Sequence, residues 1–302
     1  METSDMLIIG GGCAGLSAGM YAARLNLKTM LFAELAGGLI TTTHIVENWP
    51  GIISTSGPDL GTALWEHAKA TGVVMKSEII KSIEKRDGLF VAKSSRNEYL
   101  GKTIVLATGS KHRHLECPGE EEFANRGVSY CALCDGAFYK GKTVCIVGGG
   151  DSAAKEALFL AQHAVKVYVI VRKDVLRAEP ANMKLIEQEP KIEVLFREEV
   201  AEILGSQSVE KVRLKSGKEL EAEGVFVAIG QIPLTDLAVS LGVELNERGE
   251  IKINRHSETN VLGVYACGDC TDTEFKQAIT GSAEGVTAAY FGFKFVKGGG
   301  GF

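Results

Sequence analysis

Apolar residues along the chain come in short runs that end at glycine-rich turns, which is typical of strands buried in a parallel sheet. The first run, residues 6–9, leads into Gly10–Gly15 (GGGCAG), and an alanine-rich helical stretch follows from Leu16 to about Leu25. Residues 28–32 predict the next strand, and Glu34 follows it. This order of strand, glycine turn, helix, strand and acid predicts one half of a dinucleotide-binding fold.

The glycines of this turn have separate tasks in such a fold. Gly10 permits the tight turn, Gly12 lets backbone amides approach a pyrophosphate, and Gly15 lets the helix pack closely on the strand. Glu34 stands where an acid binds a ribose hydroxyl. Because 36 of the 302 residues are glycine, the spacing alone carries little weight, and the position between a strand and a helix supports the prediction.

The same plan recurs in the second half of the chain. Residues 143–147 predict a strand, Gly148, Gly150 and Ala153 have the offsets of a second glycine turn, and a helix and a strand ending at Val171 follow. Cations follow this strand where the first copy has an acid. Cations there suit the 2′-phosphate of NADP, and a solvated basic turn is the alternative. The cations are Arg172, Lys173 and Arg177.

Two copies of this plan predict an α/β protein with two Rossmann-like, three-layer dinucleotide-binding domains. A length of 302 residues suits two domains of roughly 150 residues. Because a helical pattern at residues 277–294 follows the second copy, we expect the first domain to be discontinuous, with two crossings that form a hinge. The predicted domains are residues 1–113 with 242–302, which would bind one dinucleotide, and residues 114–241, which would bind a second dinucleotide and carry a Cys-x-x-Cys pair.

Composition excludes several classes of function. Hydrophobic residues make up 45% and charged residues 24%, and the net charge is −5. The mildly acidic balance argues against nucleic-acid binding, which needs a basic surface. Apolar runs stay below the roughly 18 residues of a membrane helix, so no membrane partner is expected. The acidic start, residues 1–5, differs from the basic start of a signal peptide, and we expect a cytoplasmic protein.

Two Cys-x-x-Cys pairs stand out among the seven cysteines. Cys131 and Cys134 have the spacing of a redox disulfide at a helix start. Half of a zinc site or two small buried residues are the alternatives, and a zinc site would want a second pair nearby. The other pair, Cys267 and Cys270, lies too far along the chain to complete such a site, so no metal site is expected. These two cysteines have the pattern of small residues in a buried strand, and a second redox pair is the alternative. Asp269 could accept a hydrogen bond from a cofactor hydroxyl.

Around Cys131–Gly136 the chain closely resembles the low-molecular-weight thioredoxin reductases, and the likeness covers essentially the whole chain. Other matching stretches are Gly37-Gly38 with Thr41–Thr43, Glu47–Gly51, Arg126–Tyr130, Cys267–Asp269 and Lys276–Ala278.

The resemblance implies FAD at the first glycine turn and NADPH at the second. The residues implied for FAD are Gly10, Gly12, Cys13, Ala14, Gly15, Glu34, Gly37, Gly38, Leu39, Ile40, Thr42, Asn48, Gly268, Asp269, Lys276, Gln277 and Ala278. Those implied for NADPH are Gly148, Gly150, Asp151, Ser152, Ala153, Arg172, Lys173 and Arg177.

The resemblance also implies the catalytic roles. Cys134 corresponds to the sulfur that faces the flavin, Cys131 to the one that attacks the partner disulfide, and Asp135 to the acid that protonates the leaving thiolate. Electrons would pass from NADPH through FAD and the Cys131–Cys134 disulfide to thioredoxin or a glutaredoxin-like protein. A homodimer is implied by the resemblance alone.

The chain departs from the family at three positions. Val171-Arg172-Lys173 replaces a usual His-Arg-Arg, Lys155 replaces the first of two glutamates, and Leu39 replaces a glutamine. A ferredoxin or deazaflavin donor is therefore an alternative to NADPH, although relatives of that kind erode the second glycine turn, which this chain keeps. A dithiol oxidase that passes electrons to oxygen, and a flavin-bearing redox sensor without turnover, are further alternatives.

Overall fold

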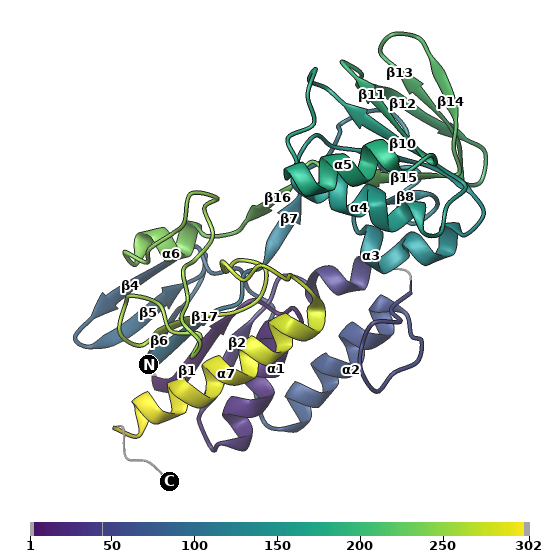
Figure 1. The fold of residues 1–302 in the computed structure, drawn as a ribbon. Helices are drawn as coiled ribbons and strands as arrows, with labels where there is room; N and C mark the ends of the chain where they lie inside the picture. The colour runs from purple at the N-terminus through teal and green to yellow at the C-terminus, as the bar shows by residue number, and fades with distance from the viewer. Residues whose placement is uncertain (1–2, 44, 299–302) are drawn as a thin grey trace. The chain divides into compact units, whose positions relative to one another are not determined.

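The computed structural model describes residues 3–43 and 45–298 and divides into two compact units (Figure 1). Unit 1 comprises Met1–Lys111 and Ile232–Phe302, and unit 2 comprises His112–Gln231. The first unit is therefore discontinuous in sequence. The connecting segments, β7 (Ser110–His112) and β16 (Gln231–Pro233), pair as a two-stranded sheet.

The second crossing lies before the boundary predicted at residues 241–242. Helix α6 (Asp236–Ser240) packs against strand β4 (Ser82–Arg86) and so belongs to unit 1. Ala238 on this helix is fully buried in the same apolar cluster as Ile83. This packing against a distant strand leaves no local mark in the sequence, which is why the prediction placed residues 232–241 in the other domain.

Unit 1 is built on one seven-stranded sheet in the order β3–β2–β1–β6–β5–β4, with β17 also paired to β6. Strands β3, β2, β1, β6 and β17 are parallel, whereas β5 pairs antiparallel with both of its neighbours, β6 and β4. The bounds are β1 Thr3–Ile9, β2 Thr29–Phe32, β3 Val74–Lys76, β4 Ser82–Arg86, β5 Leu89–Lys93, β6 Glu98–Leu106 and β17 Val264–Ala266.

Side chains that alternate along β1 separate the layers of unit 1. Met6 and Ile8 pack into a cluster with the helices α1 (Cys13–Arg24), α2 (Gly57–Ala70) and α7 (Ala278–Val296). Leu7 and Ile9 pack into a second cluster with β4, β5 and the chain that follows β16. Figure 1 shows α7 running alongside α1 on the helical side of the sheet.

Unit 2 repeats this arrangement with a fully parallel sheet in the order β11–β10–β9–β15–β8. A three-stranded antiparallel sheet, β12–β13–β14, accompanies it. The strands are β8 Val128–Ser129, β9 Thr143–Val147, β10 Lys166–Val171, β11 Ile192–Phe196, β12 Val200–Gly205, β13 Val209–Leu214, β14 Glu219–Glu221 and β15 Gly224–Val227.

The layers of unit 2 follow from the same alternation. Val144 and Ile146 pack against the helices α3 (Ala132–Asp135), α4 (Asp151–Ala161) and α5 (Pro180–Gln188). Cys145 and Val147 instead pack against the antiparallel sheet. The parallel strands β11–β10–β9–β15–β8 match β3–β2–β1–β6–β17 of unit 1 in order, so the predicted repeat of a Rossmann-like, three-layer α/β plan is confirmed.

Two kinds of feature are absent from residues 3–43 and 45–298. In this part of the chain, no helix combines the length and apolar character needed to cross a bilayer. The same residues contain no group of three or more His, Cys, Asp or Glu side chains placed to hold a metal ion.

Candidate active site

The first glycine turn connects β1 to α1 at the carboxyl end of the parallel strands. Gly10 has a φ of +123°, and a Cβ there would lie 2.0 Å from the carbonyl oxygen of Ala107, so only glycine fits. Its N–H donates to the Phe32 carbonyl (2.9 Å). The N-cap residue of α1 is Gly12, which has no side chain to accept the N–H groups of the first turn. This helix end is therefore able to bind an anion.

A second glycine pair lies directly against this turn. Gly12 and Gly37 form a backbone bridge, and a Cβ on Gly38 would lie 2.6 Å from the Cα of Gly12. Gly38 starts the 3₁₀ turn η1 (Gly38–Thr42), which holds Leu39, Ile40 and Thr42. The exposed Glu34 lies in the short segment between β2 and this pair. The predicted FAD residues 10–15 and 34–42 are thus neighbours in unit 1.

Residues 268–282, in the C-terminal part of unit 1, contact the start of helix α1. Ser282 on α7 donates to the carbonyl of Cys13 (3.2 Å), and a Cβ on Gly268 would lie 3.0 Å from that of Ala14. Lys276 Nζ donates to the carbonyl of Asp269 (3.0 Å). These contacts place Gly268, Asp269 and Lys276–Ala278 beside the start of α1.

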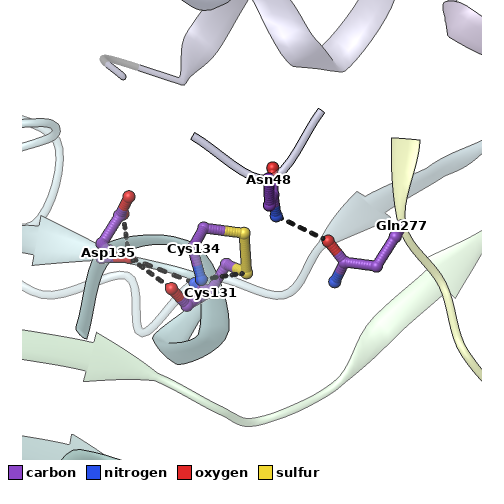
Figure 2. Close-up of a disulfide and its surroundings, with 6 residues drawn as sticks. Asn48, Cys131, Cys134, Asp135 and Gln277 are labelled. Carbon is purple, nitrogen blue, oxygen red and sulfur yellow. Dashed lines mark hydrogen bonds between the residues drawn. A yellow bond between two sulfur atoms is a disulfide. The ribbon is translucent and has the colours of Figure 1, made fainter. Parts of the chain in front are cut away.

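Asn48 and Gln277 connect two further parts of unit 1. Asn48 Nδ2 donates to Gln277 Oε1 (3.1 Å; Figure 2), although the two residues are 229 positions apart. Gln277 is also the N-cap of α7, where it forms a capping box with Thr280. The hydrogen bond therefore ties the loop that contains Asn48 to the start of α7, next to Ala278.

The second glycine turn connects β9 to α4 in unit 2. Gly150 is the N-cap of α4 and, like Gly12, has no side chain to accept N–H groups. Arg177 donates its backbone N–H to the carbonyl of Gly149 (2.9 Å), so the basic segment is held beside the turn. Arg172, Lys173 and Arg177 are exposed and, among the residues that the structure describes, form no ion pair. Three cations without an ion pair, beside a helix N-terminus whose N–H groups lack a side-chain acceptor, suit a phosphate group.

An acidic residue starts α4, and a lysine one turn later compensates it. Lys155 Nζ lies 2.7 Å from Asp151 Oδ2 and 3.7 Å from Glu179 Oε1. Lys155, the N–H of Glu179 and the amide of Asn182 together lower the pKa of Asp151 to about 2. Asp151 is therefore ionised and paired. Ser152 next to it is exposed, and Ala153 is buried against the sheet.

Cys131 and Cys134 form a disulfide at the start of α3, with their Cα atoms 5.3 Å apart (Figure 2). Cys131 is the N-cap of this one-turn helix, and its sulfur accepts the N–H of Cys134 (3.2 Å). Both residues are partly exposed, and Leu133 between them is 49% exposed. A disulfide at the surface is accessible to thiol exchange.

Asp135 follows the disulfide and is held by Ser129. The Ser129 hydroxyl donates to Asp135 Oδ2 (2.6 Å) and accepts the N–H of Cys131 (3.1 Å). One serine therefore fixes both the carboxylate and the backbone of the first cysteine. Asp135 also contributes, after burial, to the raised pKa of Tyr139, which is about 12.

The other Cys-x-x-Cys pair differs from the first. Cys267 and Cys270 are free thiols with 0% exposure, and Cys270 Sγ donates to the carbonyl of Cys267 (3.4 Å). Burial raises the pKa of both thiols, so they are poor nucleophiles. This agrees with their interpretation as small buried residues.

Sequence reasoning missed two acids near the disulfide. Glu120, 4% exposed, accepts the Tyr130 hydroxyl (2.9 Å) and the N–H groups of Leu115 (3.0 Å) and Glu116 (2.8 Å), and so anchors the residue before Cys131. Glu120 begins a run of three acids that carries no local sign of burial. Burial raises the pKa of Glu156, on α4, to about 7, and the backbone of Ala132 opposes that rise. Glu156 lies on the apolar stripe of its helix, a signal that the sequence did offer.

Known proteins with the same organisation cover nearly all of this chain. The family model described as pyridine nucleotide-disulphide oxidoreductase matches residues 4–285. The chain is 37% identical over 292 residues to the thioredoxin reductase of Bacillus subtilis, covering 94% of this chain and 92% of that protein. It is 38% identical to a B. subtilis NADH dehydrogenase, of which it covers only 59%.

The likeness extends to three dimensions. The crystal structure of thioredoxin reductase from Streptococcus pyogenes matches with a TM-score of 0.93 at 35% identity, covering 98% of this chain and 99% of that one. The chain therefore belongs to the pyridine nucleotide-disulphide oxidoreductase family, in its low-molecular-weight thioredoxin reductase branch.

Proposed function

We propose that this protein is a thioredoxin-disulfide reductase that takes electrons from NADPH and passes them, through FAD and the Cys131–Cys134 disulfide, to thioredoxin or a glutaredoxin-like protein. The observation that carries the proposal is a partly exposed disulfide on a short helix, in a unit that also contains a glycine turn and a basic segment. A dinucleotide site and a redox disulfide together suit transfer of two electrons to a disulfide substrate.

We assign FAD to unit 1, residues 1–111 with 232–302. The start of α1 would bind the pyrophosphate through the N–H groups at and after Gly12, with Gly10 forming the tight turn before them. A Cβ on Gly12 would meet no atom closer than 4.0 Å, so the space beside it is open to a ligand. Glu34 would bind a ribose hydroxyl and Asp269 the ribityl chain. When bound, FAD supplies a two-electron carrier between a nicotinamide and a disulfide.

We assign NADPH to unit 2. The start of α4 would bind its pyrophosphate, and Arg172, Lys173 and Arg177 would bind its 2′-phosphate. Lys155 supports this assignment because it neutralises Asp151, which would otherwise repel the pyrophosphate. A ferredoxin or deazaflavin donor is the second candidate, and the intact glycine turn and exposed cations favour NADPH.

The thiol chemistry follows from the three residues at α3. In the reduced enzyme the Cys131 thiolate attacks the partner disulfide, and the partner thiolate that leaves takes a proton from Asp135. The Cys134 thiol then returns a proton to the Asp135 carboxylate, and the resulting thiolate attacks Cys131 in the mixed disulfide. The Cys131–Cys134 bond re-forms, and the second partner sulfur leaves as a thiolate that takes its proton from water. The two electrons have then moved from the enzyme dithiol to the partner.

We also infer the oligomeric state, the location and the partners of the enzyme. The resemblance to the thioredoxin reductases supports a homodimer. The composition supports a cytoplasmic protein without nucleic-acid or membrane partners.

The test is to mix the flavin-loaded protein anaerobically with NADPH or with NADH and to follow bleaching of the flavin absorbance, then to add thioredoxin. Rapid bleaching by NADPH and reoxidation by thioredoxin are expected. Bleaching by a dithiol but by neither nicotinamide would replace NADPH with another donor. Rapid peroxide formation from small dithiols in air, with no reduction of thioredoxin, would favour the oxidase alternative.

A further inference from the structure

The loop of residues 267–277, which connects β17 to α7, contains Asp269, the residue that we assign to the ribityl chain of FAD. Gly268 before it has a φ of +79°, a conformation that favours glycine. Backbone N–H and C=O groups that leave water need hydrogen-bond partners. Two acids that the proposed electron pathway does not use, Glu250 and Glu284, belong to the network that supplies partners for this loop.

Glu284 on α7 accepts hydrogen bonds from the first half of this loop. Its Oε2 accepts the N–H of Gly268 (2.7 Å), and its Oε1 accepts the hydroxyl of Thr273. The hydroxyl of Thr271, which is fully buried, donates to the carbonyl of Gly268 (2.8 Å). Hydrogen bonds to a carboxylate are stronger than those between neutral groups. One side chain therefore binds the loop at two points, directly before and shortly after Asp269.

Helix α7 brings Glu284 to the loop because a glycine lies on the same face of the helix. Gly281 precedes Glu284 by three residues, a spacing that places both on one face. A Cβ on Gly281 would lie 3.2 Å from the Cα of Gly268, so the helix and the loop are in contact here. A Cβ on Gly285 would lie 2.1 Å from the carbonyl oxygen of Ala14, so α7 also fits closely against α1. Glu284 therefore reaches the loop from a helix that is itself fixed.

Lys276 binds carbonyl groups of the same loop. Its Nζ donates to the carbonyls of Asp269 (3.0 Å) and Thr271. The same ammonium group lies 3.0 Å from Oε1 of Glu250, which is 9% exposed. The carbonyl groups of the loop are therefore bound by an ammonium group, just as one of its N–H groups is bound by the carboxylate of Glu284.

These contacts fix the surroundings of a group that would bind FAD. Gly268, Asp269, Lys276 and Glu284 line one small pocket of unit 1. The Asp269 carboxylate also accepts the Ser110 hydroxyl (3.4 Å). A binding group that is already fixed before its ligand arrives loses less conformational freedom on binding, so the ligand is held more tightly. Asp269 is such a group only as long as the loop backbone keeps its place.

We propose that Glu284 is a positioning residue of the FAD site, whose carboxylate fixes the loop backbone at Gly268 and thereby holds Asp269 in place for the cofactor. The effect on FAD rests on the proposed function, whereas the contacts of Glu284 with the loop do not. A positioning role requires hydrogen bonds at the right place rather than a charge. Glutamine can supply them, because its carbonyl oxygen accepts the N–H of Gly268 and its amide donates to the hydroxyl oxygen of Thr273.

The first test is the rate at which FAD leaves the flavin-loaded, full-length protein after dilution, measured by the rise in free-flavin fluorescence. Glu284→Ala removes both acceptor oxygens, and FAD is expected to leave about tenfold faster than from the wild type. Glu284→Gln is expected to keep the rate within about threefold of the wild type. Glu274→Ala, which removes an exposed acid of the same loop, is the matched control. Wild-type release from Glu284→Ala, or equally fast release from the Ala and Gln variants, would overturn the positioning role.

The second test separates a local effect from a general loss of stability. Hydrogen exchange is followed in two peptides of the same full-length proteins, residues 265–273 around the loop and residues 98–106 in strand β6 of the same unit. In Glu284→Ala the loop peptide is expected to exchange about tenfold faster at Gly268, whose N–H has lost its acceptor, and the β6 peptide is expected to be unchanged. Glu284→Gln is expected to restore protection. Equal acceleration in both peptides, or in neither, would overturn the proposal.

A milder variant covers the case in which Glu284→Ala fails to fold. Thr273→Val keeps the shape of threonine, leaves α7 intact and removes one donor to Glu284, so FAD is expected to leave about threefold faster. Release at the wild-type rate would overturn the proposal. Hydrogen exchange needs no flavin, so a wild-type protein that shows the expected loop protection but binds no FAD would contradict the proposed function alone.

Discussion

The Ser129 hydroxyl donates a hydrogen bond to Asp135 Oδ2 at 2.6 Å. Because the same hydroxyl accepts the N–H of Cys131, the position of the acid and the position of the first cysteine depend on one side chain. Ser129 is 6% exposed, so water cannot readily replace it. The acid that we assign to proton delivery is therefore held in place from strand β8, directly before the redox motif.

Ser129→Ala is expected to slow the reduction of thioredoxin about tenfold. The variant leaves the Cys131 N–H without its acceptor and frees the Asp135 carboxylate to rotate, and a hydrogen bond to a charged group contributes about 1.5–3 kcal/mol. Stopped-flow measurements should show an unchanged rate of flavin reduction by NADPH, since the hydrogen bonds of the Ser129 hydroxyl go to Cys131 and Asp135. An equal slowing of both steps would mean that the variant disturbs the whole unit.

Cys131→Ser and Cys134→Ser are each expected to abolish the reduction of thioredoxin while FAD stays bound. A serine oxygen cannot form the disulfide, and the electrons then have no route to the partner. Cys117→Ser is the matched control, because Cys117 is a free thiol with a pKa that burial raises to about 11. Turnover with thioredoxin and the flavin spectrum measure the two effects. Full turnover in either motif variant would contradict the assigned mechanism.

Local patterns predicted those parts of the molecule that depend on residues close in sequence. The strand–glycine–helix units and the Cys-x-x-Cys pair could be identified because backbone sterics at Gly10 and the spacing of Cys131 and Cys134 are local properties. The assignment of Asn48 and Gln277 came only from the resemblance, since 229 residues separate the two partners of that bond.

The features that the sequence analysis misplaced or missed depend on tertiary contacts. The second crossing was misplaced because α6 is held by burial of Ala238 against a distant strand. The sequence could not distinguish the buried Glu120 from its neighbours Glu121 and Glu122. The difference arises because the folded chain brings the Tyr130 hydroxyl to Glu120. Glu156 could have been found, since an acid between Ala153 and Leu160 interrupts an otherwise apolar face.

Arg172→Ala is expected to raise the KM for NADPH about tenfold and to leave the KM for NADH nearly unchanged. The guanidinium is exposed beside the second glycine turn and is assigned to the 2′-phosphate, which NADH lacks. A tenfold change corresponds to about 1.4 kcal/mol. Lys184→Ala on α5 removes another exposed cation of unit 2 and serves as the control. Equal changes for both nucleotides would remove Arg172 from phosphate binding.

Lys155→Gln is expected to weaken the dependence of stability on acid pH. Asp151 has a folded-state pKa of about 2, below its ordinary 3.8, chiefly because of Lys155. A carboxyl with a lowered pKa adds stability that is fully present above pH 4 and is lost as the pH falls through 2. Without Lys155 the pKa of Asp151 moves back toward its ordinary value. Protonation of Asp151 at acid pH then removes less stability from the folded protein. The urea midpoint should therefore fall less between pH 5 and pH 2.5 in the variant than in the wild type. Lys184→Gln is the control and should follow the wild type, and an identical fall in all three proteins would show that the Lys155–Asp151 pair adds nothing to stability.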